Sequence, residues 1–84
     1  MNTFLLNIVM DSKTVFSDQA SYCGVVVSSG SMGFEAGHEP FLGVLQEDSD
    51  VSYTDNSGAK SSVNLESGII SFKNNICTIT GILA

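Results

Sequence analysis

His38 is the only histidine in this 84-residue chain, and imidazole is the side chain best suited to proton transfer near neutral pH. With Ser29 or Ser31 as nucleophile it could serve a small hydrolase, in which the imidazole takes the proton of the serine hydroxyl. Such catalysis requires a nucleophile, a base and an orienting acid in contact, and the sequence indicates no such contact. A lone loop histidine is more often a structural or interface residue, so we predict no catalytic residue.

Acidic side chains could do chemistry by binding a metal ion. Counting an EF-hand loop from Asp48 places Tyr53 and Ala59 where a glycine and a glutamate are required, so the calcium pattern is missing. Zinc requires three or four histidine, cysteine or acidic ligands, and no local spacing supplies them. We therefore interpret the acids from Glu47 to Asp55 as solvated, and we predict no metal site.

Two further groups, the cysteines and a glycine-rich segment, could support redox chemistry or phosphate binding. Cys23 and Cys77 form no Cys-x-x-Cys motif, which leaves redox catalysis little support. They could pair, but both lie in apolar, strand-like runs, where free buried cysteines are the commoner case. Gly30–Gly33 is no phosphate loop, because a phosphate loop opens a helix, and here a polar loop and a strand follow. We predict no cofactor.

Charge and length exclude several classes of partner. Nine acidic residues against three lysines give a formal net charge of −6. Nucleic-acid binding requires cations that neutralise phosphates, so that class is nearly excluded, and an anionic membrane surface is disfavoured for the same reason. No apolar run approaches the roughly 20 residues of a spanning helix, and the start lacks the basic region of a secretory signal. We expect one domain over residues 1–84, cytoplasmic and reduced, without direct membrane insertion.

Short apolar segments with a two-residue period must position the groups named above. We predict the strands Phe4–Met10, Thr14–Phe16, Tyr22–Val27, Phe41–Leu45, Val51–Thr54, Ser62–Leu65, Ile69–Phe72 and Ile76–Thr80. Turn signals separate them at Asp11–Lys13, Ser17–Asp18, Ser28–Gly30, Glu47–Asp50, Asp55–Gly58, Ser67–Gly68 and Asn74–Asn75. About eight to ten short strands at this spacing indicate an all-β fold, a small antiparallel β-sandwich or flattened barrel.

The segment from Gly30 to Leu42 interrupts the strands with three of the eight glycines, the histidine and the only proline. Glycine permits backbone angles that other residues resist, whereas proline fixes one angle and removes a donor. We therefore expect an irregular loop with a fixed shape. Loops on rigid scaffolds often carry function, and this one indicates a docking surface more than an active site.

The order of these motifs resembles a known family. The segment FLLNIVMDSKTVFS, residues 4–17, has the form of an opening strand followed by a short segment that ends in Phe-Ser. Gly30 and Gly33 precede a Gly-His-x-Pro motif with two apolar residues, here GHEPFL, and a hairpin, a Ser-Gly turn and the final strand ICTITGILA follow. This arrangement resembles the N-terminal β-sandwich domain of the epsilon subunit of F-type ATP synthases, called delta in mitochondria.

The chain departs from that family at several positions, as a divergent member would. Ala36 stands where proline is usual, Gln46–Asp48 replaces a Pro-Gly turn, and Ser71 and Gly81 stand at positions that are commonly acidic. The family usually adds a C-terminal pair of helices, and nothing here encodes them. The ATP binding and inhibition that those helices support in some relatives are therefore not implied for this chain.

The resemblance implies a rotor component without its own active site, peripheral to the cytoplasmic face of the inner or plasma membrane and soluble when isolated. It would couple the gamma subunit to the c-ring for proton- or sodium-driven ATP synthesis or hydrolysis. By position, the loop facing the c-ring would contain Ser28, Ser29, Gly30, Ser31 and Met32, and the gamma-facing residues would be Met10, His38, Glu39, Pro40 and Gly43. The alternative is a stand-alone β-sandwich module that binds another protein through the same loop.

Overall fold

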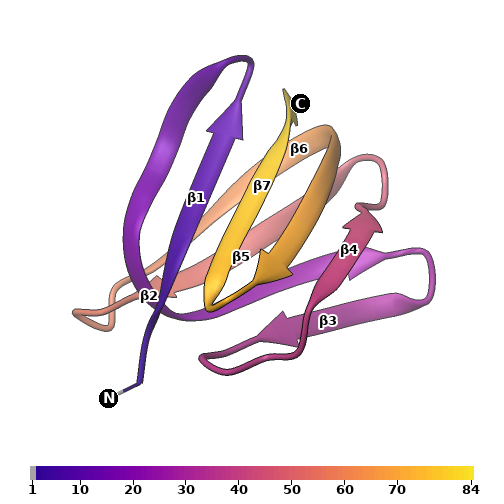
Figure 1. Ribbon diagram of the computed structural model, residues 1–84. Coiled ribbons are helices and arrows are strands. Elements are labelled where there is room, and N and C mark those ends of the chain that lie inside the picture. Colours follow the sequence, from indigo (N-terminus) through magenta and orange to yellow (C-terminus); the bar gives the residue numbers. More distant parts are fainter. Residues whose placement is uncertain (1) are drawn as a thin grey trace.

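The computed structural model describes residues 2–84, whose regular elements are all β-strands (Figure 1). The strands are β1 (Phe4–Met10), β2 (Lys13–Val27), β3 (Gly30–Phe34), β4 (Phe41–Val44), β5 (Ser49–Asp55), β6 (Lys60–Lys73) and β7 (Ile76–Leu83). Among these residues no helix is long and apolar enough to cross a membrane. The all-β class expected from the sequence is confirmed.

Strand β1 shows how the alternation of side chains sets the fold. Its four even-numbered residues, Phe4, Leu6, Ile8 and Met10, are buried, and the three between them are half-buried. The strand pairs antiparallel with the first half of β2 and parallel with β7. Because successive side chains of a strand point to opposite faces, this period places one apolar face in the core.

The long strands β2 and β6 each take part in both layers of the fold. The first half of β2 pairs with β1, and its second half pairs with β5 and β3. The first half of β6 pairs with β5, and its second half lies between β4 and β7. Register irregularities occur in both strands, between Ala20 and Tyr22 and between Leu65 and Ser67. Such bulges bend a strand and increase its twist.

Two predicted strand breaks are therefore wrong. Ser17–Asp18 lies inside β2 and Ser67–Gly68 lies inside β6, so residues 2–84 form seven strands, two of which are long. Polar and glycine residues look like turn signals, but here the chain bends while keeping its ladder of backbone hydrogen bonds. The hairpin turns predicted at Asp11–Lys13 and Asn74–Asn75 are confirmed, with positive φ at Asp11, Ser12, Asn74 and Asn75.

The strands form two layers joined by β2 and β6. One layer contains β3, β5 and the adjoining halves of β2 and β6, and the other contains β4, β7, β1 and the remaining halves. The pairing of β1 with β2 closes the series β1-β7-β6-β5-β2. The molecule measures 31 × 24 × 19 Å. It is the β-sandwich or flattened barrel expected from the sequence.

One hydrophobic core lies between the layers. Seventeen buried residues form it, among them three phenylalanines, Phe4, Phe34 and Phe72. The ring of Phe72 lies 5.5 Å from that of Phe4 and 5.7 Å from that of Phe34, centroid to centroid. Burying each such side chain contributes roughly 1.5–3 kcal/mol. No buried polar or charged residue occurs within residues 2–84, so apolar burial holds the layers together.

The hairpin between β5 and β6 confirms the turn predicted at Asp55–Gly58. Asp55 Oδ1 accepts hydrogen bonds from the Ser57 hydroxyl at 2.6 Å, the Ser57 N–H at 2.8 Å and the Ala59 N–H at 3.0 Å. The Ser57 hydroxyl is the main cause that lowers the pKa of the Asp55 carboxyl; burial, the next cause, opposes it, and the backbone N–H groups add to the lowering. Gly58 has a φ of 91°, which suits glycine at this place in the turn.

Candidate functional site

The segment rich in glycine, histidine and proline connects the two layers. Gly30–Phe34 forms strand β3, which pairs with the end of β2, and Phe41–Val44 forms β4, which pairs with β6. In Figure 1 the chain turns back after β3 and returns along β4. The irregular loop is thus shorter than expected, residues 35–40, because the first glycines fit into an antiparallel ladder with β2. We call residues 35–40 the crossing loop.

His38 packs the crossing loop against the core. Its half-buried ring lies 4.5 Å from the ring of Phe34 and 5.5 Å from that of Phe72. Its Nδ1 lies 2.7 Å from the backbone oxygen of Glu39. Because a carbonyl oxygen can only accept, Nδ1 carries the proton in this contact. The imidazole therefore holds the shape of the loop, as the structural interpretation predicts.

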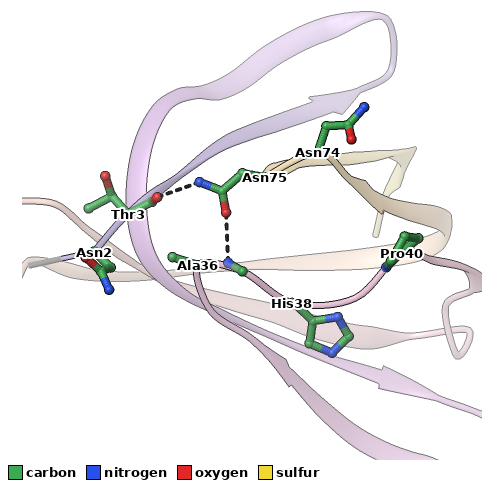
Figure 2. Close-up of a pocket in the computed structure, with 8 residues that line it drawn as sticks. Asn2, Thr3, Ala36, His38, Pro40, Asn74 and Asn75 are labelled. Carbon is green, nitrogen blue, oxygen red and sulfur yellow. Dashed lines mark hydrogen bonds between the residues drawn. The ribbon is translucent and has the colours of Figure 1, made fainter.

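Asn75 fastens the same loop to the start of the chain. Its side chain accepts a hydrogen bond from the Gly37 N–H at 2.9 Å and donates one to the Thr3 oxygen at 2.9 Å (Figure 2). Its backbone oxygen accepts a third from the Leu5 N–H at 3.1 Å. Sequence reasoning identified Asn75 as a turn residue and missed this role. The Asn74-Asn75 pair is the feature of the sequence that could have indicated this role. Asparagine tolerates the left-handed conformation of a turn, and its side-chain amide can both donate and accept a hydrogen bond.

A shallow hollow opens beside these contacts, as Figure 2 shows. Its lining residues are Asn2, Thr3, Ala36, Gly37, His38, Pro40, Asn74 and Asn75. Amides, backbone and a single imidazole dominate it. The side-chain amide of Asn75 is already hydrogen-bonded to Gly37 and Thr3, so it holds the loop in place.

The hydrolase hypothesis finds no support in this geometry. Ser29 precedes β3 and His38 follows its end, so the five residues of that strand separate them, about 16 Å of extended chain. Ser31 lies within β3, opposite Val26 of β2. Among the hydrogen bonds of residues 2–84, neither serine contacts His38. The same residues contain no cluster of three or more potential metal ligands.

The residues predicted to face a c-ring form a hairpin tip. Ser28 and Ser29 make the turn between β2 and β3, whereas Gly30, Ser31 and Met32 already belong to β3. The expectation of a loop over all five residues is therefore corrected. All but Met32 are exposed, and Gly30 has a φ of 124°. The tip is small, polar and accessible.

The predicted gamma-facing residues divide into two groups. His38, Glu39, Pro40 and Gly43 lie together on the crossing loop and β4, where Glu39 and Pro40 are exposed and the other two are half-buried. Met10 is only 1% exposed, and its side chain lies in the core. It belongs to the inward-pointing set of β1, so it cannot offer its side chain to a partner while the domain stays folded.

Sequence reasoning missed an exposed apolar surface on β4, β6 and β7. Leu42 is 76% exposed and Val44 is 73% exposed, and Ile69 and Ile82 are also exposed. Val44 lies opposite Ile69 of β6, which lies opposite Thr80 of β7. Leu42 and Ile82 lie two positions from Val44 and Thr80 on their own strands, and therefore on the same face. We call these four aliphatic residues the apolar strip. The sequence of β4 could have indicated this surface, because its apolar residues do not alternate with polar ones. A strand that is apolar on both faces has a continuous run of apolar residues.

The fold defines a small β-sandwich domain whose exposed features include the crossing loop, the hairpin tip and the apolar strip. Residues 3–81 match the model of the family described as ATP synthase, Delta/Epsilon chain, beta-sandwich domain. The chain belongs to this family. The resemblance seen in the motifs is confirmed.

Solved structures share the fold at low sequence identity. A chain in the Euglena gracilis mitochondrial ATP synthase structure with OSCP, F1 and c-ring has a TM-score of 0.89 and 15% identity, over 98% of this chain and 52% of that one. A chain in the Tetrahymena thermophila mitochondrial ATP synthase central stalk and c-ring structure has a TM-score of 0.76 and 12% identity, over 93% and 62%. This chain therefore spans roughly half to three fifths of those relatives. No curated protein sequence matches it.

Proposed function

We propose that this chain is the β-sandwich domain of an epsilon-type subunit, delta in mitochondrial terms, in the central stalk of an F-type ATP synthase. It has no active site of its own and couples the gamma subunit to the c-ring during proton- or sodium-driven ATP synthesis or hydrolysis. The observation that carries the proposal is the family match over residues 3–81. The two fold relatives, taken from ATP synthase structures, agree with it.

The hairpin tip, residues 28–32, is the proposed contact with the c-ring. Its three serines and Gly30 are exposed, Met32 is half-buried, and it carries no charged side chain. A polar, uncharged tip suits repeated contact with the polar loops of a ring, because no fixed ion pair has to break as the partners shift. The net charge of −6 would orient the domain toward basic partner loops more than it would add affinity.

The crossing loop and β4 are the proposed gamma-facing surface, formed by His38, Glu39, Pro40 and Gly43. The neighbouring Leu42 and Val44 supply exposed apolar area on the same strand. The loop is held by Asn75 and by the packing of His38 on the core. A loop ordered before docking loses less conformational entropy on docking, which favours binding. Met10 is left out of this surface because its side chain is buried.

Co-purification tests the proposal. The tagged chain is isolated from detergent-solubilised native membranes, and bound proteins are identified by mass spectrometry. We expect the gamma subunit and the c subunit, in a peripheral, membrane-associated complex. Failure of both purified partners to bind the chain at micromolar concentration would exclude the proposal. Capture of a different protein alone would favour the stand-alone interaction module.

A pair of matched variants locates the surface. Leu42→Glu places a charge in the apolar strip, where a side chain 76% exposed tolerates it in the isolated domain. Val15→Glu places the same charge on β2, at another exposed aliphatic residue. We expect the Leu42 variant to lose gamma and the Val15 variant to retain it. Equal retention by both variants would move the gamma contact away from β4.

A further inference from the structure

Two cysteines face each other across the core, one from each layer. Cys23 lies opposite Phe34 in the β2–β3 pair, and Cys77 lies opposite Phe72 in the β6–β7 pair. The rings of Phe34 and Phe72 stack across the core at 5.7 Å with an angle of 18°. Directly opposed residues of paired strands share a face, so the stacked rings bring the two cysteines beside them together.

The side chains confirm this placement. Both cysteines are free and fully buried. The neighbouring Cys77 thiol, followed by burial, raises the pKa of Cys23 well above its usual range. The two cysteines are therefore neighbours in the core, although 53 residues separate them in the sequence, from position 24 to position 76.

We propose that Cys23 and Cys77 are a modification site, a dithiol that a small-molecule disulfide converts into a disulfide bond between the two layers of the sandwich. This site is independent of the proposed function. Its basis is the placement of two buried cysteines, one on β2 and one on β7, beside the stacked rings of Phe34 and Phe72.

The reaction balances with the small disulfide as the oxidant. One cysteine thiolate attacks a sulfur of that disulfide and forms a mixed disulfide, and the first small thiolate leaves and takes up a proton. The second cysteine thiolate attacks the protein sulfur of the mixed disulfide, and the second small thiolate leaves and is protonated. The two cysteines lose two electrons and two protons in total, and the small disulfide becomes two thiols.

Burial makes the folded state resistant to this reaction, so the rate depends on opening of the fold. A protonated, buried thiol is a poor nucleophile. Within residues 2–84, β3 pairs only with β2, so release of this edge strand is a small opening that uncovers Cys23. After the mixed disulfide forms, reclosure of the core returns Cys77 to the modified sulfur, which favours the internal bond over a second adduct.

The bond would restrict the unfolded chain and hold the layers together. A disulfide that closes a loop of this length typically raises the equilibrium constant for folding by about a hundredfold or more. We therefore expect oxidation to raise the midpoint of thermal unfolding. Opening of the layers would become correspondingly rarer.

The test uses the reduced 84-residue chain and mixtures of oxidised and reduced glutathione, at a temperature just below its unfolding midpoint. Intact-mass spectrometry should show the loss of two hydrogens, and peptide mapping without reduction should join the peptides of Cys23 and Cys77. Cys23→Ala and Cys77→Ala should yield one glutathione adduct and no internal bond. The oxidised wild type should melt at a higher temperature than the reduced form.

Three outcomes would overturn the proposal. They are glutathione adducts on both cysteines without an internal bond, disulfide-linked dimers as the main product, and an internal bond that lowers the melting temperature. The mapping of the wild-type chain requires no variant. Poor folding of an alanine variant therefore leaves the decisive measurement intact.

Discussion

Asn75 and Gly37, which lie 38 positions apart in the sequence, are joined by a 2.9 Å hydrogen bond from the Gly37 N–H to the Asn75 side chain. The same amide donates to the Thr3 oxygen. One side chain in the β6–β7 turn therefore fixes both the crossing loop and the approach to β1. The proposed gamma-facing surface depends on this contact, because the loop that carries it is otherwise held mainly by the packing of His38.

Asn75→Ala should release the loop and lower stability. The variant loses two hydrogen bonds and places alanine at a φ of 62°, so we expect a fall of about 1–3 kcal/mol in the free energy of unfolding. Asn74→Ala is the matched control, since Asn74 has a φ of 52° and makes no side-chain hydrogen bond within residues 2–84. Urea unfolding measures both, and hydrogen exchange at the Gly37 amide should accelerate only in the Asn75 variant. Equal losses would assign the effect to backbone strain alone.

His38→Ala should destabilise the domain by about 1–2 kcal/mol, because it removes a ring that packs against Phe34 and Phe72. His38→Phe keeps an aromatic ring at this place and should stay within about 0.5 kcal/mol of the wild type in urea unfolding. If the phenylalanine variant lost as much stability as the alanine variant, the bond from Nδ1 to the Glu39 oxygen would matter more than the packing.

The β5–β6 turn should show a pH dependence due to Asp55. Its pKa in the folded domain lies below the ordinary value of 3.8, chiefly because the Ser57 hydroxyl donates to the carboxylate. A lowered folded-state pKa stabilises the fold above the unfolded-state pKa, and this stabilisation disappears as the pH falls through the folded-state pKa. The difference in unfolding free energy between wild type and Asp55→Asn should therefore shrink from pH 6 to pH 2.

Ser57→Ala provides the control for that measurement. It removes the largest cause of the shift while keeping the carboxyl, so its pH dependence should be weaker than that of the wild type. Parallel curves for the wild type and Asp55→Asn across the whole range would contradict the proposed role of the carboxylate.

The features predictable from the sequence were local ones. The alternation in Phe4–Met10 identified a half-buried strand, and the Asp-Asn-Ser-Gly string identified a hairpin, because each depends on residues near in sequence. Order and spacing of the Gly-His-x-Pro motif identified the family. In the strand and the hairpin the local pattern agrees with the tertiary pairing, so the prediction from nearby residues holds there.

The features that the sequence did not show depend on distant partners. Ser67–Gly68 looks like a turn, yet both residues pair with β7, which keeps this stretch of β6 extended. Gly30–Phe34 looks irregular, yet β2 offers it an antiparallel edge. Met10 resembled a surface position by its place in the family, but the pairing of β1 with β7 turns its side chain inward.

Gly81 should prove the least replaceable glycine of the β6–β7 pair. It lies opposite Gly68, and a Cβ atom on Gly81 would overlap the backbone oxygen of Ser67 and lie 2.9 Å from the Gly68 Cα. Backbone atoms of a paired strand cannot move aside cheaply, so Gly81→Ala should cost about 1–3 kcal/mol or more. Gly43→Ala is the control, because its nearest neighbours are ring atoms of Phe41, a side chain that can rotate away. Thermal unfolding should show a clearly larger loss for Gly81→Ala, and equal losses would mean that β6 and β7 separate without difficulty.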